Sequence, residues 1–217
     1  MEYTLLGWPP DDPTLRLDHR QFAYAGKFVM SNTGKAVVRS TGEDAGRVGD
    51  ETSGGQTAAR DDVEYDTDVM AAVAFNADRN DERTLRLRYI TVRSDLKGQG
   101  FGPRLAAFVA SAADRRGYDR VAIAVNNPFA YEAMYKAGFE WTGHESGLAE
   151  LVLERPAGAR GDAGVRPDPE TYRAGFERYR NRDLGDPEAS FLADRVGADP
   201  PASVDVPDGS DSADPDA

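Results

Sequence analysis

Short apolar runs separated by polar turns divide this chain into a mixed series of expected strands and helices. Runs rich in Val, Ile, Leu and Ala, bounded by Gly, Pro, Asn and Asp, predict strands at 34–39, 69–76, 85–92, 120–125, 139–142 and 149–154. The run at 69–76 is apolar at successive positions, which indicates a central strand buried on both faces. The polar turn NADRNDER joins it to the next run and predicts an antiparallel hairpin.

A first amphipathic helix is predicted at 103–116. Its apolar residues follow the spacing i, i+3, i+4, i+7, at Leu105, Phe108, Val109 and Ala112. Pro103 suits the first helical turn, and Gly117 suits the residue after the last turn. The order strand, helix, strand around this segment implies a right-handed crossover with parallel strands.

A second helix is predicted between Asn127 and Gly138. Asn127 is a suitable N-cap, Pro128 suits the first helical position, and Gly138 ends the helix.

The first 33 residues carry a weaker pattern. A strand is predicted at 14–17, followed by a helix at 18–30 that Asp18 would cap. Gly26 lies inside this helix, so a hairpin through FAYAGKFVM stays open as the alternative.

Two polar regions flank or interrupt the expected core. Residues 40–68 are rich in Gly, Asp and Thr without a period, which predicts a flexible acidic loop. Beyond a domain at 1–156, residues 157–217 are expected to form a linker, a helix at 169–183 and a disordered tail from Val196 onward. Apolar aromatic residues near one face of that helix are Tyr172, Phe176 and Tyr179.

The charge distribution narrows the classes of partner. The formal net charge is -12, and the segments 40–68 and 157–217 carry -7 each, so the remainder is close to neutral. General nucleic-acid binding is disfavoured, because no basic field exists to displace phosphate counterions. With only four lysines and many Asp residues, the composition resembles that of proteins from salt-loving archaea.

Residue counts also exclude several chemistries. The chain has no cysteine and two histidines, so we expect no disulfide, no cysteine nucleophile and no metal site. The N-terminus lacks a signal-peptide pattern, and the longest apolar run has about seven residues, well short of the ~20 that span a bilayer. A cytoplasmic protein without membrane contact is the expectation.

The stretch KGQGFG at 97–102 carries the clearest candidate chemistry. It joins the strand at 85–92 to the helix that follows, where free backbone N–H groups and the helix dipole favour an anion such as phosphate. The pattern is not a Walker loop, because no Gly-Lys-Ser/Thr follows. It is not a clean dinucleotide fingerprint either, because the glycines fall as G-x-G-x-G and no acid ends the next strand.

Two motifs together resemble the GNAT family of acetyl-CoA-dependent N-acetyltransferases. The first is an apolar strand ending in Val, followed by Q/R-x-x-G-x-G/A at a helix start; here Lys97 stands in the Q/R position, with Gly100 and Gly102 as the key glycines. The second is N-x-x-A opening a helix that ends in Gly-Phe; here the residues are Asn127, Ala130, Gly138 and Phe139. The resemblance implies an α/β (α+β) fold with a mixed, mostly antiparallel sheet, flanking helices and a splayed central strand pair.

The same resemblance implies the cofactor site. Acetyl-CoA would be the co-substrate, with its pantetheine arm along the backbone of Ile90, Thr91 and Val92 and its thiol end near Asn127. The pyrophosphate would bind backbone amides in the loop, with Lys97, Arg93 and Arg104 as nearby charges; the loop residues are Gly98, Gln99, Gly100, Phe101 and Gly102. Pro103 departs from the pattern, because it removes one amide donor.

The catalytic acid is less well defined. Family members often carry a tyrosine four residues before the Gly of Gly-Phe, and Met134 occupies that position here. Tyr135 is the neighbouring candidate, Tyr131 is a further one, and the absence of any tyrosine acid also stays open. Candidates for a general base, by residue type alone, are His144, Glu145 and Glu132.

The expected function is transfer of an acetyl group to a primary amine of a small molecule, protein or peptide. The alternative is a non-catalytic acyl-CoA-binding module on the same fold, which Met134 in the tyrosine position favours. A nucleotide-phosphate binder of another fold is the third reading. The acceptor is not readable from the sequence, and both a monomer and a homodimer stay open.

Overall fold

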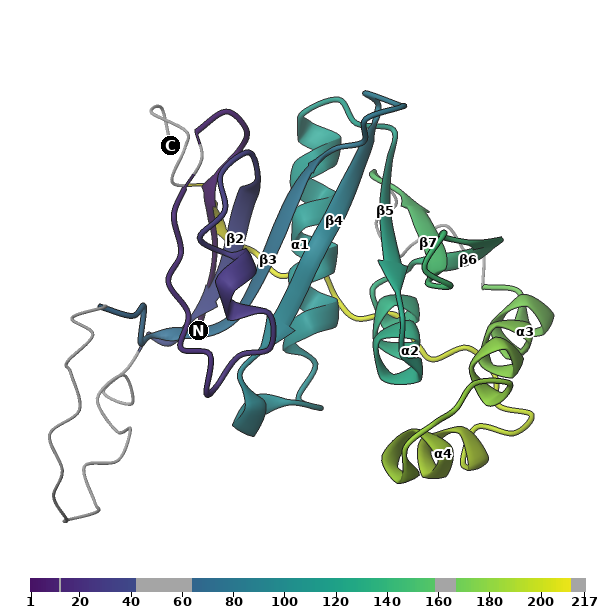
Figure 1. The fold of residues 1–217 in the computed structure, drawn as a ribbon. Coiled ribbons are helices and arrows are strands. Elements are labelled where there is room, and N and C mark those ends of the chain that lie inside the picture. The colour runs from purple at the N-terminus through teal and green to yellow at the C-terminus, as the bar shows by residue number, and fades with distance from the viewer. Residues whose placement is uncertain (12, 42–63, 159–166, 212–217) are drawn as a thin grey trace, which may run out of the picture.

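The computed structural model describes residues 1–11, 13–41, 64–158 and 167–211 (Figure 1). Most of the acidic loop predicted at 40–68 therefore lies outside the described residues. None of the described helices has the length and apolar character that a membrane span requires.

The core is one mixed sheet of eight strands in the order β6-β7-β5-β4-β3-β2-β1-β8. Every neighbouring pair is antiparallel except β4–β5 and β1–β8. The strands are β1 (Glu2–Gly7), β2 (Gly34–Arg39), β3 (Val69–Ala77), β4 (Thr84–Val92), β5 (Arg120–Val125), β6 (Glu140–Glu145), β7 (Leu151–Pro156) and β8 (Ser210–Asp211). All six strands predicted between positions 34 and 154 are present. The bounds of β2 and β5 are as predicted, β3 and β4 are one residue longer, and β6 and β7 begin one and two residues later than predicted and end three and two residues later.

The central pair β4–β5 separates part of the way along its length. The parallel register runs from Thr84–Arg120 to Leu87–Ile123 and then stops, while β4 continues for five more residues to Val92. This is the splayed strand pair that the sequence resemblance implies, and with the mostly antiparallel sheet it confirms the predicted fold class.

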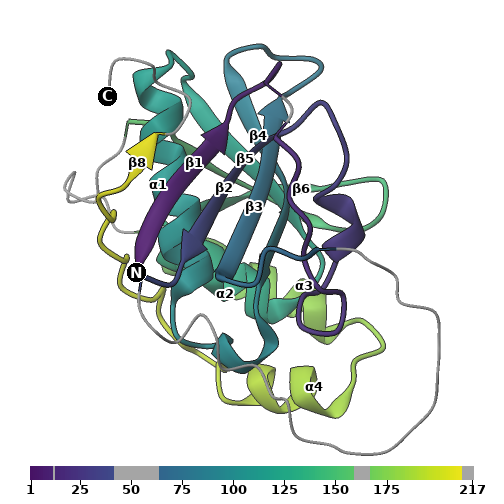
Figure 2. The same cartoon turned by 90° about the vertical axis from the view of Figure 1, so that its left-hand side faces the viewer.

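Helices α1 (Phe101–Arg115) and α2 (Pro128–Lys136) pack against one face of the sheet. Their apolar side chains join those of β1 to β7 in one large core cluster. On the other face, residues of the segment 15–28 cover β2 and β3 in a smaller cluster. Figure 2 shows α1 and this dark purple segment on opposite sides of the sheet.

The N-terminal prediction is wrong in its elements. The first strand lies at Glu2–Gly7 rather than at 14–17, and 18–30 holds only a 3-10 turn, Ala25–Lys27, instead of a helix or a hairpin. Leu15, Leu17 and Phe22 are buried against β2 and β3. Tertiary packing thus orders this segment without regular secondary structure, which overrides the local helical spacing.

The C-terminal region is more ordered than its composition predicts. The predicted helix is present as α3 (Pro169–Arg180), and a further helix, α4 (Asp186–Ala193), follows it. Residues after Val196, where the sequence predicts disorder, run past α2 and α1 to β1, as the yellow segment in Figure 1 shows. The N–H of Val204 donates to the carbonyl of Lys136, and β8 pairs in parallel with β1.

Aromatic packing attaches α3 to the rest of the core. Tyr172, Phe176 and Tyr179, which share the predicted apolar face, are buried with Tyr131 and Tyr135 of α2. The Tyr131 hydroxyl donates to the carbonyl of Tyr172 at 3.1 Å. A second contact links α2 to the segment just after α4. Nε of Arg195 donates to the carboxylate of Glu132 at 2.8 Å.

The hydroxyl of Tyr131 on α2 lies directly against Gly175 of α3. A Cβ built there would overlap the buried hydroxyl of Tyr131, so Gly175→Ala should force the two helices apart. Overpacking of this kind costs about 1–3 kcal/mol, against a helix-propensity gain of up to about 1 kcal/mol. We expect a net loss of about 1–2 kcal/mol in the free energy of unfolding, measured by urea denaturation.

Gly26→Ala is the matched control, because nothing lies within 4 Å of a Cβ built there. It should change the unfolding free energy by less than about 0.5 kcal/mol. An equal effect of both substitutions would contradict the packing described for α3.

Candidate functional site

The glycine loop lies between the end of β4 and the start of α1. After Val92, a short 3-10 turn, Ser94–Leu96, leads into the loop, and Gly100 stands at the N-cap of α1. Gly98 and Gly100 have φ angles of 81° and 84°, in the left-handed region that favours glycine. The two glycines therefore set the path by which the chain turns from the strand into the helix.

Several amides in this loop have no hydrogen-bond acceptor. Among the described residues, no acceptor is found for the N–H groups of Gly98, Gly100, Phe101 and Gly102, and Gly100 receives no side-chain cap. The N–H of Gln99 donates to the carbonyl of Leu96 at 3.4 Å, so it is the one loop amide already engaged. Free amides at a helix N-terminus, where the dipole is positive, form a site for an anion.

The far half of β4 lies directly beside this loop. A Cβ built on Gly102 would stand 3.5 Å from Cγ2 of Val92 and 4.0 Å from Cδ1 of Ile90. The start of α1 thus contacts the end of β4, and the two candidate parts of the site are contiguous.

The backbone direction of β4 can be followed from one hydrogen bond. The N–H of Arg93 donates to the carbonyl of Met70 at 2.9 Å, on the β3 side. Because successive peptide groups of a strand point to opposite edges, Thr91 also faces β3, while Ile90 and Val92 face the edge that β5 has left. Of the three predicted pantetheine-binding residues, two therefore present N–H and C=O groups to the opening.

The charged residues around the loop differ in their availability. Lys97 is exposed and has no ion-pair partner among the described residues. Arg93 is tied to Asp95, with Nε 2.8 Å from the carboxylate. Arg104 is exposed with its guanidinium carbon 3.9 Å from the position of a Cβ on Gly100, so its charge lies at the loop.

Asn127 caps α2 as predicted. Its Oδ1 accepts from the N–H of Ala130 at 2.8 Å, and its Nδ2 donates to Asn126. Because β4 and β5 are parallel, Asn127 follows the end of β5 at the same edge of the sheet as Val92.

Residues of the C-terminal region complete the end of β5. The Tyr179 hydroxyl donates to the carbonyl of Val125 at 2.9 Å, and Arg182 donates to that of Asn126 at 3.3 Å. The sequence predicted the helix that carries Tyr179, but nothing in its pattern indicated this contact.

Tyr135 lies inside the core. It is 1% exposed, its hydroxyl accepts from the N–H of Trp141 at 3.1 Å, and a second hydrogen bond of 3.2 Å joins its hydroxyl to that of Tyr131. Burial raises its pKa, against the opposing effect of those hydrogen bonds. Burial likewise raises the pKa of Tyr131, and Met134 is also buried. All three side chains are therefore buried in the core.

The candidate bases lie apart from the glycine loop. The carboxylate of Glu132 is engaged by Lys136 and Arg195; burial alone would raise its pKa, but these hydrogen bonds outweigh burial and the pKa is lowered. Glu145 forms an ion pair with Arg178 at 3.6 Å. His144 is exposed on β6, two strands beyond β5 in the sheet order.

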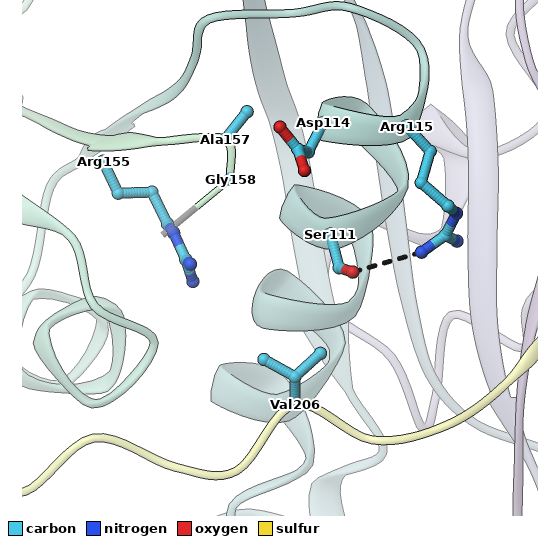
Figure 3. A pocket seen from close by; sticks show the side chains of 7 residues that line it. All are labelled: Ser111, Asp114, Arg115, Arg155, Ala157, Gly158 and Val206. Atoms are coloured by element: carbon cyan, nitrogen blue, oxygen red, sulfur yellow. Dashed lines mark hydrogen bonds between the residues drawn. The ribbon is translucent and has the colours of Figure 1, made fainter. Parts of the chain in front are cut away.

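Two shallow hollows elsewhere do not border the glycine loop. One lies between the last turns of α1 and the end of β7, where Asp114, Arg155 and Val206 face each other and Arg115 donates to Ser111 (Figure 3). The other is lined by residues of β6 and the start of α3. Within the described residues, no group of three or more His, Cys, Asp or Glu side chains could hold a metal ion.

One family model matches a part of the chain that contains the glycine loop. Residues 40–139 match a family model described as the acetyltransferase (GNAT) family, which supports the resemblance found in the sequence. No curated protein matches the chain.

Three solved structures are similar at low identity. A nourseothricin acetyltransferase has 19% identity and a TM-score of 0.42, over 58% of this chain and 66% of that one, just under two thirds of its length. Tetrahymena GCN5 has 14% identity and a TM-score of 0.41, over 62% and 74%. A Bacillus subtilis acetyltransferase in complex with CoA has 16% identity and a TM-score of 0.38, over 57% and 76%.

The buried tyrosines predict a loss of stability at alkaline pH. Burial raises the pKa values of Tyr131, Tyr135, Tyr172 and Tyr179 above that of an unfolded tyrosine, near 10. Above pH ~10 the unfolded state loses protons that the folded state keeps, so the free energy of unfolding should fall as pH rises. The expected slope is up to about 1.4 kcal/mol per pH unit for each such tyrosine.

Urea unfolding between pH 9 and 11.5 measures this slope. Tyr135→Phe should reduce it by one tyrosine's share, whereas Tyr24→Phe, which removes an exposed hydroxyl, should leave it unchanged. A stability that is flat across this range would show that the tyrosine cluster is open to solvent.

Proposed function

We propose that this chain is a member of the GNAT family and transfers an acetyl group from acetyl-CoA to a primary amine. The observation that carries this proposal is the row of four acceptor-free amides at the start of α1, in contact with the open edge of β4. The family match at 40–139 includes both features. A pyrophosphate and an amide-bearing arm are the chemistry that such a pair of sites would take.

Acetyl-CoA would lie from the glycine loop toward the end of β5. Its pyrophosphate would accept hydrogen bonds from the four amides of 98–102 other than that of Gln99, with the charge of Lys97 nearby. Its pantetheine arm would pair with the backbone of Ile90 and Val92 as an added strand does at a sheet edge. The thioester would then come close to Val92 and Asn127, where the two strands are furthest apart.

The reaction would join the amine nitrogen to the acetyl carbon and break the C–S bond. The amine must be neutral to attack, and at pH ~7 an amine of pKa ~10.4 needs roughly 4–5 kcal/mol to lose its proton. That proton would pass to water or a base, and the electron pair of the C–S bond would leave with the CoA sulfur. As negative charge develops on the carbonyl oxygen, the N–H of Val92 would be its donor.

We further propose that the CoA thiolate leaves without a tyrosine acid. A thiol pKa of roughly 8.5 makes the thiolate a tolerable leaving group near neutral pH. Tyr135, the sequence candidate, is a weaker acid than usual here because burial raises its pKa, and its hydroxyl is held by Trp141 and Tyr131.

The same burial also favours the second candidate function, an acyl-CoA-binding module without catalysis. Both functions predict CoA binding, so turnover separates them. Release of free CoA in the presence of amines supports the transferase, whereas tight binding of acetyl-CoA with no release under any acceptor supports the binding module.

Gly100→Ala tests the anion site. The substitution adds a Cβ beside the free amides and strains a φ of 84°, so we expect CoA affinity to fall at least tenfold, measured by isothermal titration calorimetry. Gly117→Ala is the matched control, because it imposes the same strain at φ 79° just beyond the opposite end of α1. If the two variants weaken CoA binding equally, the amides at 98–102 are not the site.

Tyr135→Phe tests the role of the buried tyrosine. We expect kcat and the alkaline limb of its pH profile to stay within about twofold of the parent, while the free energy of unfolding falls by about 1–3 kcal/mol, because the N–H of Trp141 loses its acceptor. A loss of 10²-fold or more in kcat with the fold retained, as removal of a general acid produces, would assign the acid to Tyr135 instead.

A further inference from the structure

A β-bulge lies in β4 next to the point where β5 departs. In the β3–β4 register, Ala74 pairs with Tyr89 and Phe75 pairs with Leu87, so Arg88 is the extra residue. Leu87 is also the last residue of β4 in register with β5. Bulges re-aim the side chain that they carry, and this one places an arginine at the apex of the opening.

Arg88 differs from the other arginines near it. Its Nε donates to Oδ1 of Asn76 at 2.7 Å, and among the described residues no carboxylate lies within ion-pair distance of its guanidinium. Arg86, two positions earlier, holds Asp78 at 2.6 Å, and Arg93 holds Asp95. Arg88 is therefore a partly buried cation, and Asp78, the acid that acts on its charge, is already paired with Arg86.

The electrostatics around Arg88 favour an added anion. Burial lowers its pKa, and the neighbouring charges of Arg86 and Arg79 act in the same direction. Both effects show that the protonated, positively charged form of Arg88 is destabilised at this position. A carboxylate bound to the guanidinium would remove that cost, and its planar, bidentate geometry matches that group.

Aromatic side chains stand beside this cation. Tyr89 follows Arg88 in β4, Tyr24 lies with its ring 6.1 Å from that of Tyr89, and Nζ of Lys27 is 5.8 Å from the Tyr89 ring. Tyr24 is 55% exposed and has a φ of 60°, a strained conformation for a bulky residue. The segment is fixed to the end of β4, because Ser94 donates through both its N–H and its Oγ to the carbonyl of Gln21.

This cluster lies on the face of β4 opposite α1. Tyr89 packs with the smaller apolar cluster, whereas Ile90 and Val92 pack with the large core on the α1 side. In Figure 1 no described helix lies in front of β4 and β5. A molecule could therefore reach the opening from this side while CoA occupies the α1 side.

We propose that Arg88 is a specificity-determining residue that selects acceptors bearing a carboxylate as well as the reacting amine, namely short peptides with a free C-terminus. The inference rests on the proposed acetyl transfer and adds its substrate class. With a rise of about 3.3 Å per residue, Arg88 lies roughly 7 Å along β4 from Ile90 and roughly 13 Å from Val92. An extended peptide of two or three residues has its terminal amine and carboxylate about 7–10 Å apart, so together with the reach of the arginine side chain it can span that distance.

The test uses dipeptides with a free C-terminus and the same dipeptides as C-terminal amides, with a polyamine as the cationic probe. For the parent protein we expect a lower KM for the acids. In Arg88→Gln, the KM for the acids should rise about 10- to 100-fold, as expected for loss of a charged hydrogen bond, with kcat and the KM for the amides within about twofold. Arg88→Lys should give an intermediate KM for the acids, because lysine keeps the positive charge but lacks the bidentate geometry of the guanidinium.

Arg79→Gln is the matched control, because it removes an exposed positive charge that acts on Arg88 only through space. It should leave the preference for acids intact. An equal effect of Arg88→Gln on acids and amides, no effect on either, or acetylation of the polyamine but of no dipeptide acid would each overturn the inference and leave the acetyl transfer standing. Failure of every variant and of the parent to bind acetyl-CoA would overturn the proposed function itself.

Discussion

The separation of β4 from β5 beyond Leu87 and Ile123 is the constraint from which the candidate site follows. A strand in the interior of a sheet normally has both edges hydrogen-bonded, and the far half of β4 gives up one of them. Those peptide groups need water or a ligand arm as a partner. The same separation leaves the start of α1 beside an open edge instead of a covered one. The bulge at Arg88 lies where β5 departs, so the proposed cofactor edge, the proposed anion loop and the proposed acceptor residue share one geometric origin.

Local pattern was sufficient for the elements that build this region. The strands from β2 to β7, the helices α1 and α2, the cap at Asn127 and the glycine turn depend on short-range spacing and on backbone preferences, which a sequence displays directly. The N-terminal 33 residues did not follow their pattern. Phe22, Ala25 and Phe28 have helical spacing, yet they are buried against β2 and β3 from a largely irregular segment. Long-range burial decided their structure, and no local window contains that information.

The tyrosines of α2 show a second case in which the sequence pattern does not contain the long-range packing. Counting back from Gly138 brings Met134 and Tyr135 into consideration, but the count cannot tell which face of α2 is covered. The helix α3 lies against that face, and Tyr172 packs on Tyr135 with ring centroids 4.7 Å apart. The bulge at Arg88 was equally invisible, because it appears only in the register between β3 and β4. Composition also misled at the tail, where β8 is held by pairing with β1 rather than by its own apolar residues.

The partnership of β8 with β1 has a consequence for the order of events during synthesis. The strand β1 leaves the ribosome well before β8, and its outer edge gains this partner only when residues near 210 have been made. Tyr131 and Tyr135 likewise become covered only after α3 has been synthesised. A nascent chain that ends before Pro169 would therefore expose an aromatic surface and an unpaired sheet edge, the two features that chaperones and aggregating partners engage.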